Sequence, residues 1–476
     1  MPPILAVLLW FILLLALFHF DSTKDSKTSA AVWIPITWMF IISSRLPSQW
    51  LGTGGGPAIK AYEEGNPLDR TIFLILMVLA IGVLVARSFK WSRFFSRNLF
   101  LTAFLAYALL SLLWSDLPFL TFKKWFRDLG NYLVVLVVLS DPFPLEAIRM
   151  LLRRLSFLLI PLSIVVIKYY PQIGRQYSEW SGVANYSGVA TTKDQLGAIC
   201  LVSGLYFFWD TLVRWRDRRE GKTKKRIAVN LALLAMTLWL LNMADSATCR
   251  VSFLLGCLVI VAARSKMVKR RPTLLKVLIP ATVFLCLFLV FGADMKASIA
   301  EAVGRDATFT DRTLLWAYLL DMRINPLLGT GYESFWLGPR LAELWEKFAF
   351  RPNQAHDGYI ELYLNLGIIG ASLLIGFLIV SYRDICKGMG SGSELTPLSL
   401  ALWAVTPIYN ITTASFSKGE LMWLTFLLVA ISVCRPDKGQ IPGAIGESEE
   451  ERTHFRKLLS EVRTPARASP TRAGWR

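Results

Sequence analysis

His356 is the residue whose type and position best suit acid–base chemistry. It stands in the polar segment Gln354-Ala355-His356-Asp357-Gly358-Tyr359, just before a hydrophobic run. A histidine gains and loses a proton near neutral pH, so it could accept the proton of a hydroxyl group. A lone histidine at a membrane boundary is more often an anchor at the interface, so the residue type alone does not establish catalysis.

Five basic residues near the predicted membrane boundary form a second group. Each could simply extend its alkyl chain toward the interface, which removes most of the cost of a charge near a membrane. Several converging on one cavity would instead bind a diphosphate, because an Arg side chain holds phosphate oxygens with two N–H groups at once. The five residues are Arg175, Lys193, Arg250, Arg305 and Arg312.

Common nucleotide and metal motifs are absent. The sequence has no Walker A motif, no G-x-G-x-x-G, no H-E-x-x-H and no two Asp residues separated by one position. Its six cysteines include no C-x-x-C and none in a predicted external loop, so no thiolate metal site is expected. We therefore predict chemistry without a nucleotide, a metal or another cofactor, driven by an activated lipid-linked donor.

Membrane-spanning helices must position these residues. Of 476 residues, 54% are hydrophobic and only 18% are charged, whereas soluble domains have about 25% charged residues. A run of about 20 apolar residues crosses the hydrocarbon core. Twelve or thirteen runs are predicted, near residues 3–20, 30–44, 71–86, 98–114, 129–140, 155–170, 194–213, 227–243, 249–263, 274–292, 357–380, 397–413 and 420–434.

Lys and Arg residues concentrate in alternate connections between these runs. The basic set holds 34 of the 52 Lys and Arg residues and is therefore predicted to be cytoplasmic, which places His356 and the five cations outside. The net charge of +18 is mainly a topology signal, and a nucleic-acid partner is not expected. The basic set is 21–29, 87–97, 141–154, 214–226, 264–276, 382–396 and 435–476.

The predicted fold is an all-α polytopic integral membrane protein with one long external loop. Residues 1–292 hold the first ten helices, 293–356 the long periplasmic loop, 357–434 the last three helices and 435–476 a disordered cytoplasmic tail. This division places His356 where the loop meets the eleventh span.

The long loop is predicted to contain short helices. Residues 311–322 form one, with Thr310 as its N-cap, and Asn325-Pro326 ends it before a tight turn at Gly329 and Gly331. A second, amphipathic helix follows Pro339 and is expected to lie on the bilayer, either as a lid over a lipid-borne substrate or as a structural cap. Its apolar positions are Leu341, Leu344, Trp345 and Phe348.

Several motifs resemble the O-antigen ligase and polymerase superfamily, with the closest likeness to its exopolysaccharide-production branch. The strong part covers residues 312–370, and weaker elements extend it from about residue 185. The strong motifs are Thr313-Leu314-Leu315-Trp316, Asn325-Pro326-Leu327-Leu328-Gly329-Thr330-Gly331-Tyr332, His356-Asp357-Gly358-Tyr359-Ile360-Glu361 and Leu366-Gly367-Ile368-Ile369-Gly370. The weaker ones are Thr191-Thr192-Lys193-Asp194-Gln195-Leu196-Gly197 and Ser246-Ala247-Thr248-Cys249-Arg250.

The resemblance implies a multi-pass glycosyltransferase of the bacterial inner membrane. Members of that superfamily transfer a glycan from undecaprenyl diphosphate to an acceptor sugar hydroxyl. The implied partners are an undecaprenyl-diphosphate-linked oligosaccharide donor, a glycan or lipid acceptor, membrane lipids and other polysaccharide-assembly proteins. His356 matches the residue that activates the acceptor, and Arg312 matches the basic residue before the Trp. Lys193 and Arg250 match basic diphosphate-binding positions, Arg175 more loosely, and we expect Arg305 to join them.

The sequence also departs from the family pattern. Asp357 and Asp194 stand where Asn is common, and Asp311 stands where a Gly often precedes the Arg. An ionised Asp close to His356 would raise the pKa of the imidazole or orient the ring. These differences leave the details of base catalysis open.

Other functions stay open at this point. A transporter of an anionic or lipid-linked glycan would also have many helices, although we see no internal repeat and the polar residues gather on one side. Glu63-Glu64, in the Gly-rich loop 45–70, would suit another lipid-sugar glycosyltransferase architecture with acidic residues in its first external loop. The motifs do not separate a polymerase from a ligase, because both share them.

Overall fold

The computed structural model describes residues 2–21, 28–53, 65–177, 184–215, 218–266, 268, 271–291, 310–348, 350–389 and 393–432. Helices dominate these ranges, and one antiparallel two-stranded hairpin interrupts them. The prediction of an all-α polytopic membrane protein is confirmed. Glu63-Glu64, residues 292–309 of the long loop and the predicted tail 435–476 lie outside the described residues.

Residues 3–186 form a series of helices that ends with the two-stranded hairpin. The elements in order are α1 (Pro3–Asp21), η1 (Ala30–Val32), α2 (Trp33–Ser43), α3 (Pro47–Trp50), α5 (Pro67–Ala86), α6 (Trp91–Arg97), α7 (Leu99–Leu110), η2 (Ser111–Leu113), α8 (Pro118–Leu139), α9 (Pro144–Tyr169), α10 (Pro171–Gly174), β1 (Arg175–Tyr177) and β2 (Ala184–Tyr186).

The second half contains the remaining spans and two helices of the long loop. They are α11 (Lys193–Arg214), α12 (Gly221–Met243), α13 (Ala247–Arg264), α15 (Pro272–Phe291), α17 (Thr310–Asp321), α18 (Gly338–Lys347), α19 (Gly358–Gly388), α20 (Thr396–Tyr409) and α21 (Leu421–Ala430).

Each of the thirteen predicted hydrophobic runs falls on a helix, but not every helix is long enough to span alone. Within the described residues, seven helices are long and apolar enough to cross a membrane. The count becomes up to eight if α6 and α7, which meet at a bend of 98°, form one broken span. The other runs fall on shorter helices or, in α8, on a helix whose first half is charged. Hydropathy therefore located the helices, and the number of membrane crossings stays a prediction.

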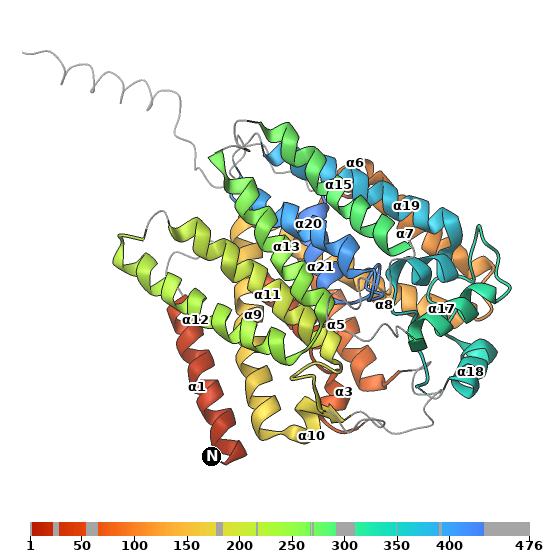
Figure 1. Ribbon diagram of the computed structural model, residues 1–476, viewed down its shortest axis with the longest axis horizontal. Helices are drawn as coiled ribbons and strands as arrows, with labels where there is room; N and C mark the ends of the chain where they lie inside the picture. The colour runs from red at the N-terminus through yellow and green to blue at the C-terminus, as the bar shows by residue number, and fades with distance from the viewer. Residues whose placement is uncertain are drawn as a thin grey trace, which may run out of the picture. The chain divides into compact units, whose positions relative to one another are not determined.

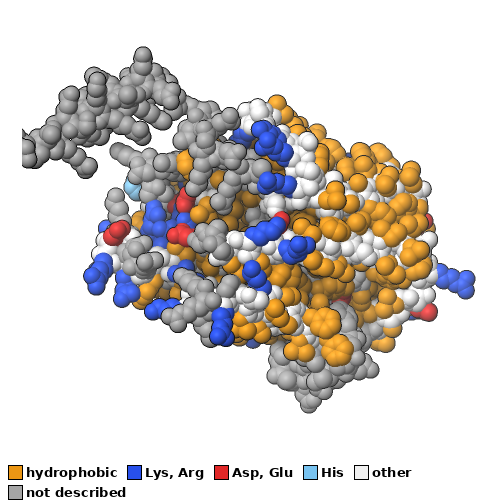
Figure 2. Space-filling view, turned by 90° about the horizontal axis from the view of Figure 1, so that it is seen from above, with side chains coloured by type: hydrophobic (Ala, Val, Ile, Leu, Met, Phe, Trp, Pro, Cys, Tyr) orange, Lys and Arg blue, Asp and Glu red, His pale blue; other side chains and the backbone are white. Residues whose placement is uncertain are grey.

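Burial separates central helices from lipid-facing ones. In the most apolar window of α11, 83% of the residues are buried, against 17% in α1. Figure 1 shows α11, α13, α20 and α21 side by side within the bundle, with α1 and α12 outside them. A helix that is hydrophobic on all sides, and whose side chains other helices do not cover, is suited to contact with lipid. Figure 2 accordingly shows broad areas of hydrophobic side chains on the face in view, with most Lys and Arg gathered to its left and centre.

Polar contacts join the connections that were predicted to be cytoplasmic. Arg87 pairs with Asp141 at 2.9 Å, linking segments 87–97 and 141–154. Arg149 pairs with Glu394, whose carbonyl also accepts a bond from Trp209 Nε1 at 2.9 Å. We call this side of the bundle the basic end. It is formed by Asp21, which pairs with Arg153 and Arg154, and by the described residues of segments 87–97, 141–154, 214–226, 264–276 and 382–396. The alternation read from charge thus matches how the segments meet, while the side of the membrane stays a prediction.

The intervening connections meet at the opposite side, which we call the loop end. Arg45 Nη2 donates to the carbonyl of Ile173 at 2.7 Å. Arg340, on α18, pairs with Asp116 at 2.9 Å. The loop end therefore comprises the segments around 44–53, 111–128, 170–177, 184–193, 244–250, 310–348, 350–358 and 410–420.

The helix α18 exists, but its apolar face does not lie on the bilayer as predicted. Leu341 and Leu344 are fully buried in a small core of the long loop. The spacing indicated correctly which face is apolar, but such a pattern cannot say whether lipid or protein covers it. The other buried residues of this core are Leu315, Trp316, Leu319, Phe335, Trp336, Ala355 and Leu364.

Candidate functional site

A turn of the long loop is bonded to a break in α19. At Gly367 the backbone leaves helical geometry, with φ of 61°. Thr330 N donates to Leu364 O at 3.0 Å, and Ile368 N donates to Pro326 O at 2.9 Å. The turn thus satisfies backbone groups that the break would otherwise leave unpaired inside a membrane.

Glycines allow the two backbones to approach so closely. The predicted turn at Gly329 and Gly331 is confirmed, with φ of 69° and 103°. A Cβ on Gly329 would lie 2.5 Å from Asn365 backbone atoms, and one on Gly367 would lie 2.3 Å from Leu327 O. The spacing of these two sequence motifs therefore has a steric cause.

His356 is held between two residues with fixed roles. The preceding Ala355 donates its N–H to Glu361 Oε2 at 2.8 Å and accepts a bond from Trp316 Nε1 at 2.7 Å. His356 itself is half-buried and adopts φ of 53°, a conformation that non-glycine residues rarely take. Unusual backbone at a polar, well-fastened position is typical of functional sites.

Asp357 acts as the N-cap of α19. Its Oδ1 accepts bonds from the backbone N–H groups of Tyr359 and Ile360, at 2.8 and 3.0 Å. Asn and Asp are equally good N-caps because each offers an oxygen at the same position. The replacement of the family's usual Asn by Asp therefore keeps a structural role that the sequence alone did not reveal.

Glu361 is the centre of a buried polar network beside His356. Glu361 is only 4% exposed. Its Oε1 accepts hydrogen bonds from Trp336 Nε1 at 2.8 Å and from Lys418 Nζ at 2.9 Å. Asn365, one turn further along α19, donates to its backbone carbonyl at 2.9 Å. Glu361 thereby fastens the His356 loop to the connection between α20 and α21.

Glu333 extends this network toward α8. Lys418 Nζ lies 3.8 Å from its carboxylate, and Lys124 Nζ donates to its backbone carbonyl at 3.2 Å. Burial raises the pKa of Glu333, but the positive charges of Lys418, Lys124 and Arg127 outweigh burial and hold that pKa below its ordinary value. Glu333 is therefore an anion that the surrounding cations stabilise.

Glu420 behaves differently, although it lies just two residues from Lys418. Burial, opposed by Lys418 and reinforced by Glu333, Asp194 and Glu361, raises the pKa of Glu420 to about 7. A carboxyl group that titrates near neutral pH can both accept and donate a proton under physiological conditions.

Hydrogen bonds connect the His356 loop to all three upstream basic elements. Gly358 N donates to Asn410 O at 2.7 Å, and Thr412 bonds Thr248 of α13 at 2.7 Å between hydroxyl oxygens. Ser246, at the start of α13, donates to Asp194 of α11 at 3.2 Å. The hairpin of β1 and β2 is also hydrogen-bonded near the N-terminus of α11. These links place the segments of Arg250 and Lys193 in one array with His356.

The hairpin residue Gln176 completes the array, because its Nε2 donates to Thr191 O at 2.5 Å. Lys193 is the first residue of α11, directly after its N-cap Thr192. Arg250, with 43% of its side chain exposed, forms an ion pair with Asp245. Both cations thus lie where helix ends meet the loop end, as the prediction required, while the structure tests neither as a ligand for phosphate.

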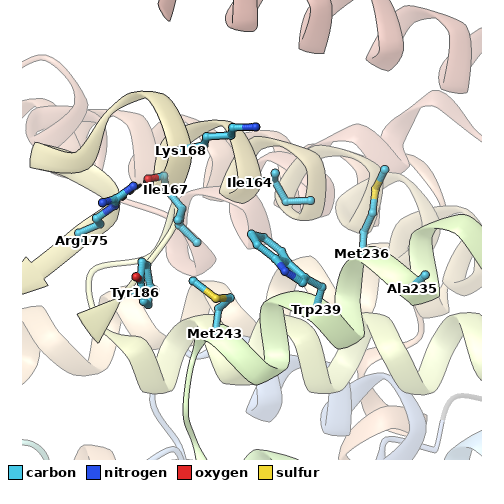
Figure 3. Close-up of a pocket in the computed structure, with 9 residues that line it drawn as sticks. All are labelled: Ile164, Ile167, Lys168, Arg175, Tyr186, Ala235, Met236, Trp239 and Met243. Carbon is cyan, nitrogen blue, oxygen red and sulfur yellow. Dashed lines mark hydrogen bonds between the residues drawn. The ribbon is translucent and has the colours of Figure 1, made fainter. Parts of the chain in front are cut away.

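Arg175 borders a groove between α9 and α12. Its Nε donates to Ile167 O at 2.9 Å, and its guanidinium lies 5.8 Å from the centre of the Tyr186 ring. Figure 3 shows Arg175 and Tyr186 at one end of the groove, Trp239 near its middle and Met236 at the other end. The groove has a volume of about 560 Å³, and its lining is apolar apart from Lys168, Arg175 and the Tyr186 hydroxyl.

The two remaining predicted cations cannot be placed as side chains. Arg312 belongs to the first turn of α17, but its side chain lies outside the described part of the structure, and so does all of Arg305. Their proposed roles stay predictions.

Comparison with known proteins bears on this arrangement. Residues 231–375 match the family described as O-antigen ligase. The chain is also 26% identical, over 325 residues, to the exopolysaccharide production protein ExoQ of Rhizobium meliloti (strain 1021), covering 65% of this chain and 70% of that protein. Both comparisons support the resemblance to the O-antigen ligase and polymerase superfamily that the motifs indicate. The family match contains Arg250 and His356, whereas Arg175 and Lys193 precede it and Lys418 and Glu420 follow it.

Several residues of the network around the His356 loop could not be singled out from the sequence. The sequence places Glu361 in a motif but indicates no role for it, and no motif distinguishes Glu333, Lys418 or Glu420. A usable signal existed: Glu361 stands inside a predicted span, and Lys418-Gly419-Glu420 stands at the start of another. Charged residues in or beside spans usually have partners, but a sequence does not name those partners.

Proposed function

We propose that this protein is a glycosyltransferase working at the loop end, on the periplasmic face of the bacterial inner membrane. The similarity to O-antigen ligases and to an exopolysaccharide production protein supports a polysaccharide-assembly membrane enzyme. In the proposed reaction it transfers glycan units from undecaprenyl-diphosphate-linked donors to an acceptor sugar hydroxyl. The observation that carries this proposal is the hydrogen-bonded array that joins the His356 loop to the segments of Lys193, Arg250 and Arg175.

In the proposed reaction, His356 accepts the proton of the acceptor hydroxyl. The acceptor oxygen forms a bond to the anomeric carbon while the bond from that carbon to the diphosphate oxygen breaks. The bonding electrons leave with the diphosphate, whose charge Arg312, Arg305, Lys193, Arg250 and Arg175 stabilise. A base contributes about 10²–10⁴-fold to such a step, and electrostatic stabilisation of the leaving group supplies much of the rest.

The donor lipid has a suitable place in this scheme. The groove of Figure 3 combines apolar walls with two cations, Lys168 and Arg175, as an isoprenoid chain attached to a diphosphate would require. Gln176, next to Arg175, contacts Thr191 beside Lys193. We infer that the chain lies in the groove and that the diphosphate points toward Lys193 and Arg250.

Glu361 and Lys418 would act as positioning residues. Glu361 fixes Ala355 and thereby the strained conformation of His356, and Lys418 compensates the charge of Glu361. The site would thus be preorganised before substrate binds, which is how enzymes obtain most electrostatic stabilisation.

The test uses purified full-length protein in proteoliposomes, supplied with undecaprenyl-diphosphate-linked repeat units of the host glycan. Products are separated by size, beside His356→Ala and the matched control His19→Ala, whose histidine is exposed at the end of α1. We expect His356→Ala to lose product by at least about 10²-fold and His19→Ala to retain it.

The product pattern separates the remaining functions. A ladder of lengths indicates a polymerase, which we favour because the matched relative is an exopolysaccharide production protein. A single transfer to a supplied acceptor indicates a ligase. Full activity of His356→Ala would overturn the base role, and no transfer from an authentic donor would point to transport, which the same vesicles can measure.

A further inference from the structure

A second cavity lies at the loop end, between α17, α18 and the segment after η2. Its volume is about 720 Å³, within the range of about 300–1,000 Å³ typical of small-molecule sites. It is lined by Asp116, Leu117, Tyr318, Asp321, Met322, Arg323, Leu337, Pro339, Arg340 and Glu343. It shares no lining residue with the groove of Figure 3.

The charges of this cleft differ from those around the predicted diphosphate site. Three carboxylates face two guanidinium groups, so the lining as a whole is not basic. Arg340 pairs with Asp116 at 2.9 Å, which leaves less of its charge for an anionic ligand. Such a mixture of donors and acceptors favours neutral groups with many hydroxyls and disfavours a diphosphate.

An aromatic side chain adds a surface on which a sugar ring can lie. Tyr318 is half-buried, its hydroxyl bonds Glu343, and Lys347 Nζ lies 3.6 Å from its ring centre. An amphipathic ring offers apolar area at low conformational cost and a polar edge for hydrogen bonds. Together with the carboxylates, it provides both kinds of contact that a polyhydroxylated ring can make.

Both walls of the cleft lead to the His356 loop. On one wall, Leu337 follows Trp336, whose Nε1 donates to Glu361 at 2.8 Å. On the other, Tyr318 is two residues from Trp316, whose Nε1 donates to the carbonyl of Ala355 at 2.7 Å. Each wall of the cleft is therefore joined through a tryptophan hydrogen bond to the segment 355–361, which contains His356.

We propose that this cleft binds neutral sugar residues of the acceptor glycan, behind the unit whose hydroxyl reacts. This inference rests on the proposed function for the role of the bound glycan, but not for the binding itself. The carboxylates of Asp321 and Glu343 accept hydrogen bonds from sugar hydroxyls, Arg323 donates to them, and Tyr318 packs against a ring. Occupation of the cleft would keep the acceptor chain near His356 between transfers and so favour longer products.

Direct binding tests the cleft without any reaction. Wild-type full-length protein in nanodiscs is titrated with free oligosaccharide repeat units, which carry no lipid and no diphosphate, and heat is measured. The variant is Glu343→Gln, and the matched control is Glu346→Gln, which is exposed on the same helix but does not line the cleft. We expect about tenfold weaker binding in Glu343→Gln, as for the loss of a hydrogen bond to a charged group, and unchanged binding in Glu346→Gln.

The other outcomes overturn the inference. Absence of binding to wild type, or equal affinity in Glu343→Gln and Glu346→Gln, would show that the cleft holds no glycan. Competition by inorganic pyrophosphate that Glu343→Gln strengthens, through loss of a repelling carboxylate, would make it an anion site. If the glycan binds as expected while authentic donor gives no transfer, the proposed function fails and the cleft stands. If Glu343→Gln binds the glycan normally and makes polymer of normal length, the inference about the cleft fails and the proposed function stands.

Discussion

The basic end and the loop end both bury carboxylates, but they compensate the charge in different ways. At the basic end, Asp141 pairs with Arg87 at 2.9 Å, and Asp21 pairs with Arg153 and Arg154. At the loop end, the carboxylates of Glu361 and Glu333 lie 2.9 and 3.8 Å from one lysine, Lys418. Arg127 with Asp128 is a neighbouring pair at the same end, at 3.1 Å.

The Arg pairs and the shared lysine stabilise buried carboxylates with different chemical groups. A guanidinium stays charged at every physiological pH and holds a carboxylate with a rigid fork, so an Arg pair ties helix ends together permanently. An ammonium shared by two carboxylates gives a cluster whose charge depends on each member and on nearby Glu420. The cluster around Lys418 therefore has a charge that can change with the protonation of its members, whereas the Arg–Asp pairs of the basic end act as permanent clamps.

Removing the shared lysine should give the largest effect. Lys418→Met leaves Glu361 buried without its cation, and breaking a buried pair in this way costs about 3–5 kcal/mol of stability. We also expect glycan transfer to be lost, since Glu361 would no longer hold the His356 loop correctly. Thermal unfolding in detergent and the transfer assay measure the two effects.

The double variant Glu361→Gln with Lys418→Met is the control for charge. Because it removes both ions, it should recover most of the stability, while transfer stays low if the ion pair positions His356. A single variant Lys418→Met with normal unfolding and normal transfer would contradict the comparison.

Breaking a clamp at the basic end should affect stability alone. Arg87 donates to Val137 O at 2.6 Å as well as to Asp141, so Arg87→Gln removes charge-assisted bonds between helix ends. We expect a loss of about 1.5–3 kcal/mol and an unchanged transfer rate per folded molecule. Arg93→Gln, an exposed Arg of the same segment, should change stability by less than about 0.5 kcal/mol. A specific loss of transfer in Arg87→Gln would mean that the two ends are coupled.

The pH dependence of stability should give the smallest effect. The pKa of Glu420 is raised to about 7 in the fold, so the folded protein holds a proton that the unfolded chain releases at lower pH. Stability from this group is thus complete below the ordinary Glu pKa and is lost as pH rises through about 7. Between pH 6 and 8 we expect a decrease of the order of 1 kcal/mol. Glu420→Gln should flatten the profile, and an equally steep profile in that variant would assign the titration to another group.

Much of the fold could be predicted because its determinants are local or additive. Hydrophobic runs located the helices, and within the described residues the Lys and Arg distribution agrees with the way the connections meet at two ends. The turn at Gly329 and Gly331 was also predictable, because glycine is the residue that adopts positive φ without strain. The burial of Leu341 and Leu344 was not, since their pattern is the same whether lipid or protein covers it.

Only those residues of the candidate site that are conspicuous by type or position could be predicted from the sequence. His356 stood out as a histidine in a polar segment, and the basic elements stood out by their positions. The network of Glu361, Glu333 and Lys418 depends on segments 28 to 85 residues apart that meet in space, and no local pattern encodes that meeting. The sequence suggested that the charge of Asp357 acts on the imidazole of His356, and it did not indicate that Asp357 caps α19.

The break in α19 has a consequence for how this protein can be recombined with its relatives. The Asn325–Tyr332 turn and the helix on either side of Gly367 exchange backbone hydrogen bonds, including Gly331 N to Asn365 O at 2.9 Å. Neither segment has a complete set of partners without the other. The two therefore form a single module for grafting and inheritance: a chimera that replaces one segment alone leaves mismatched backbones, whereas one that exchanges both transplants an intact joint.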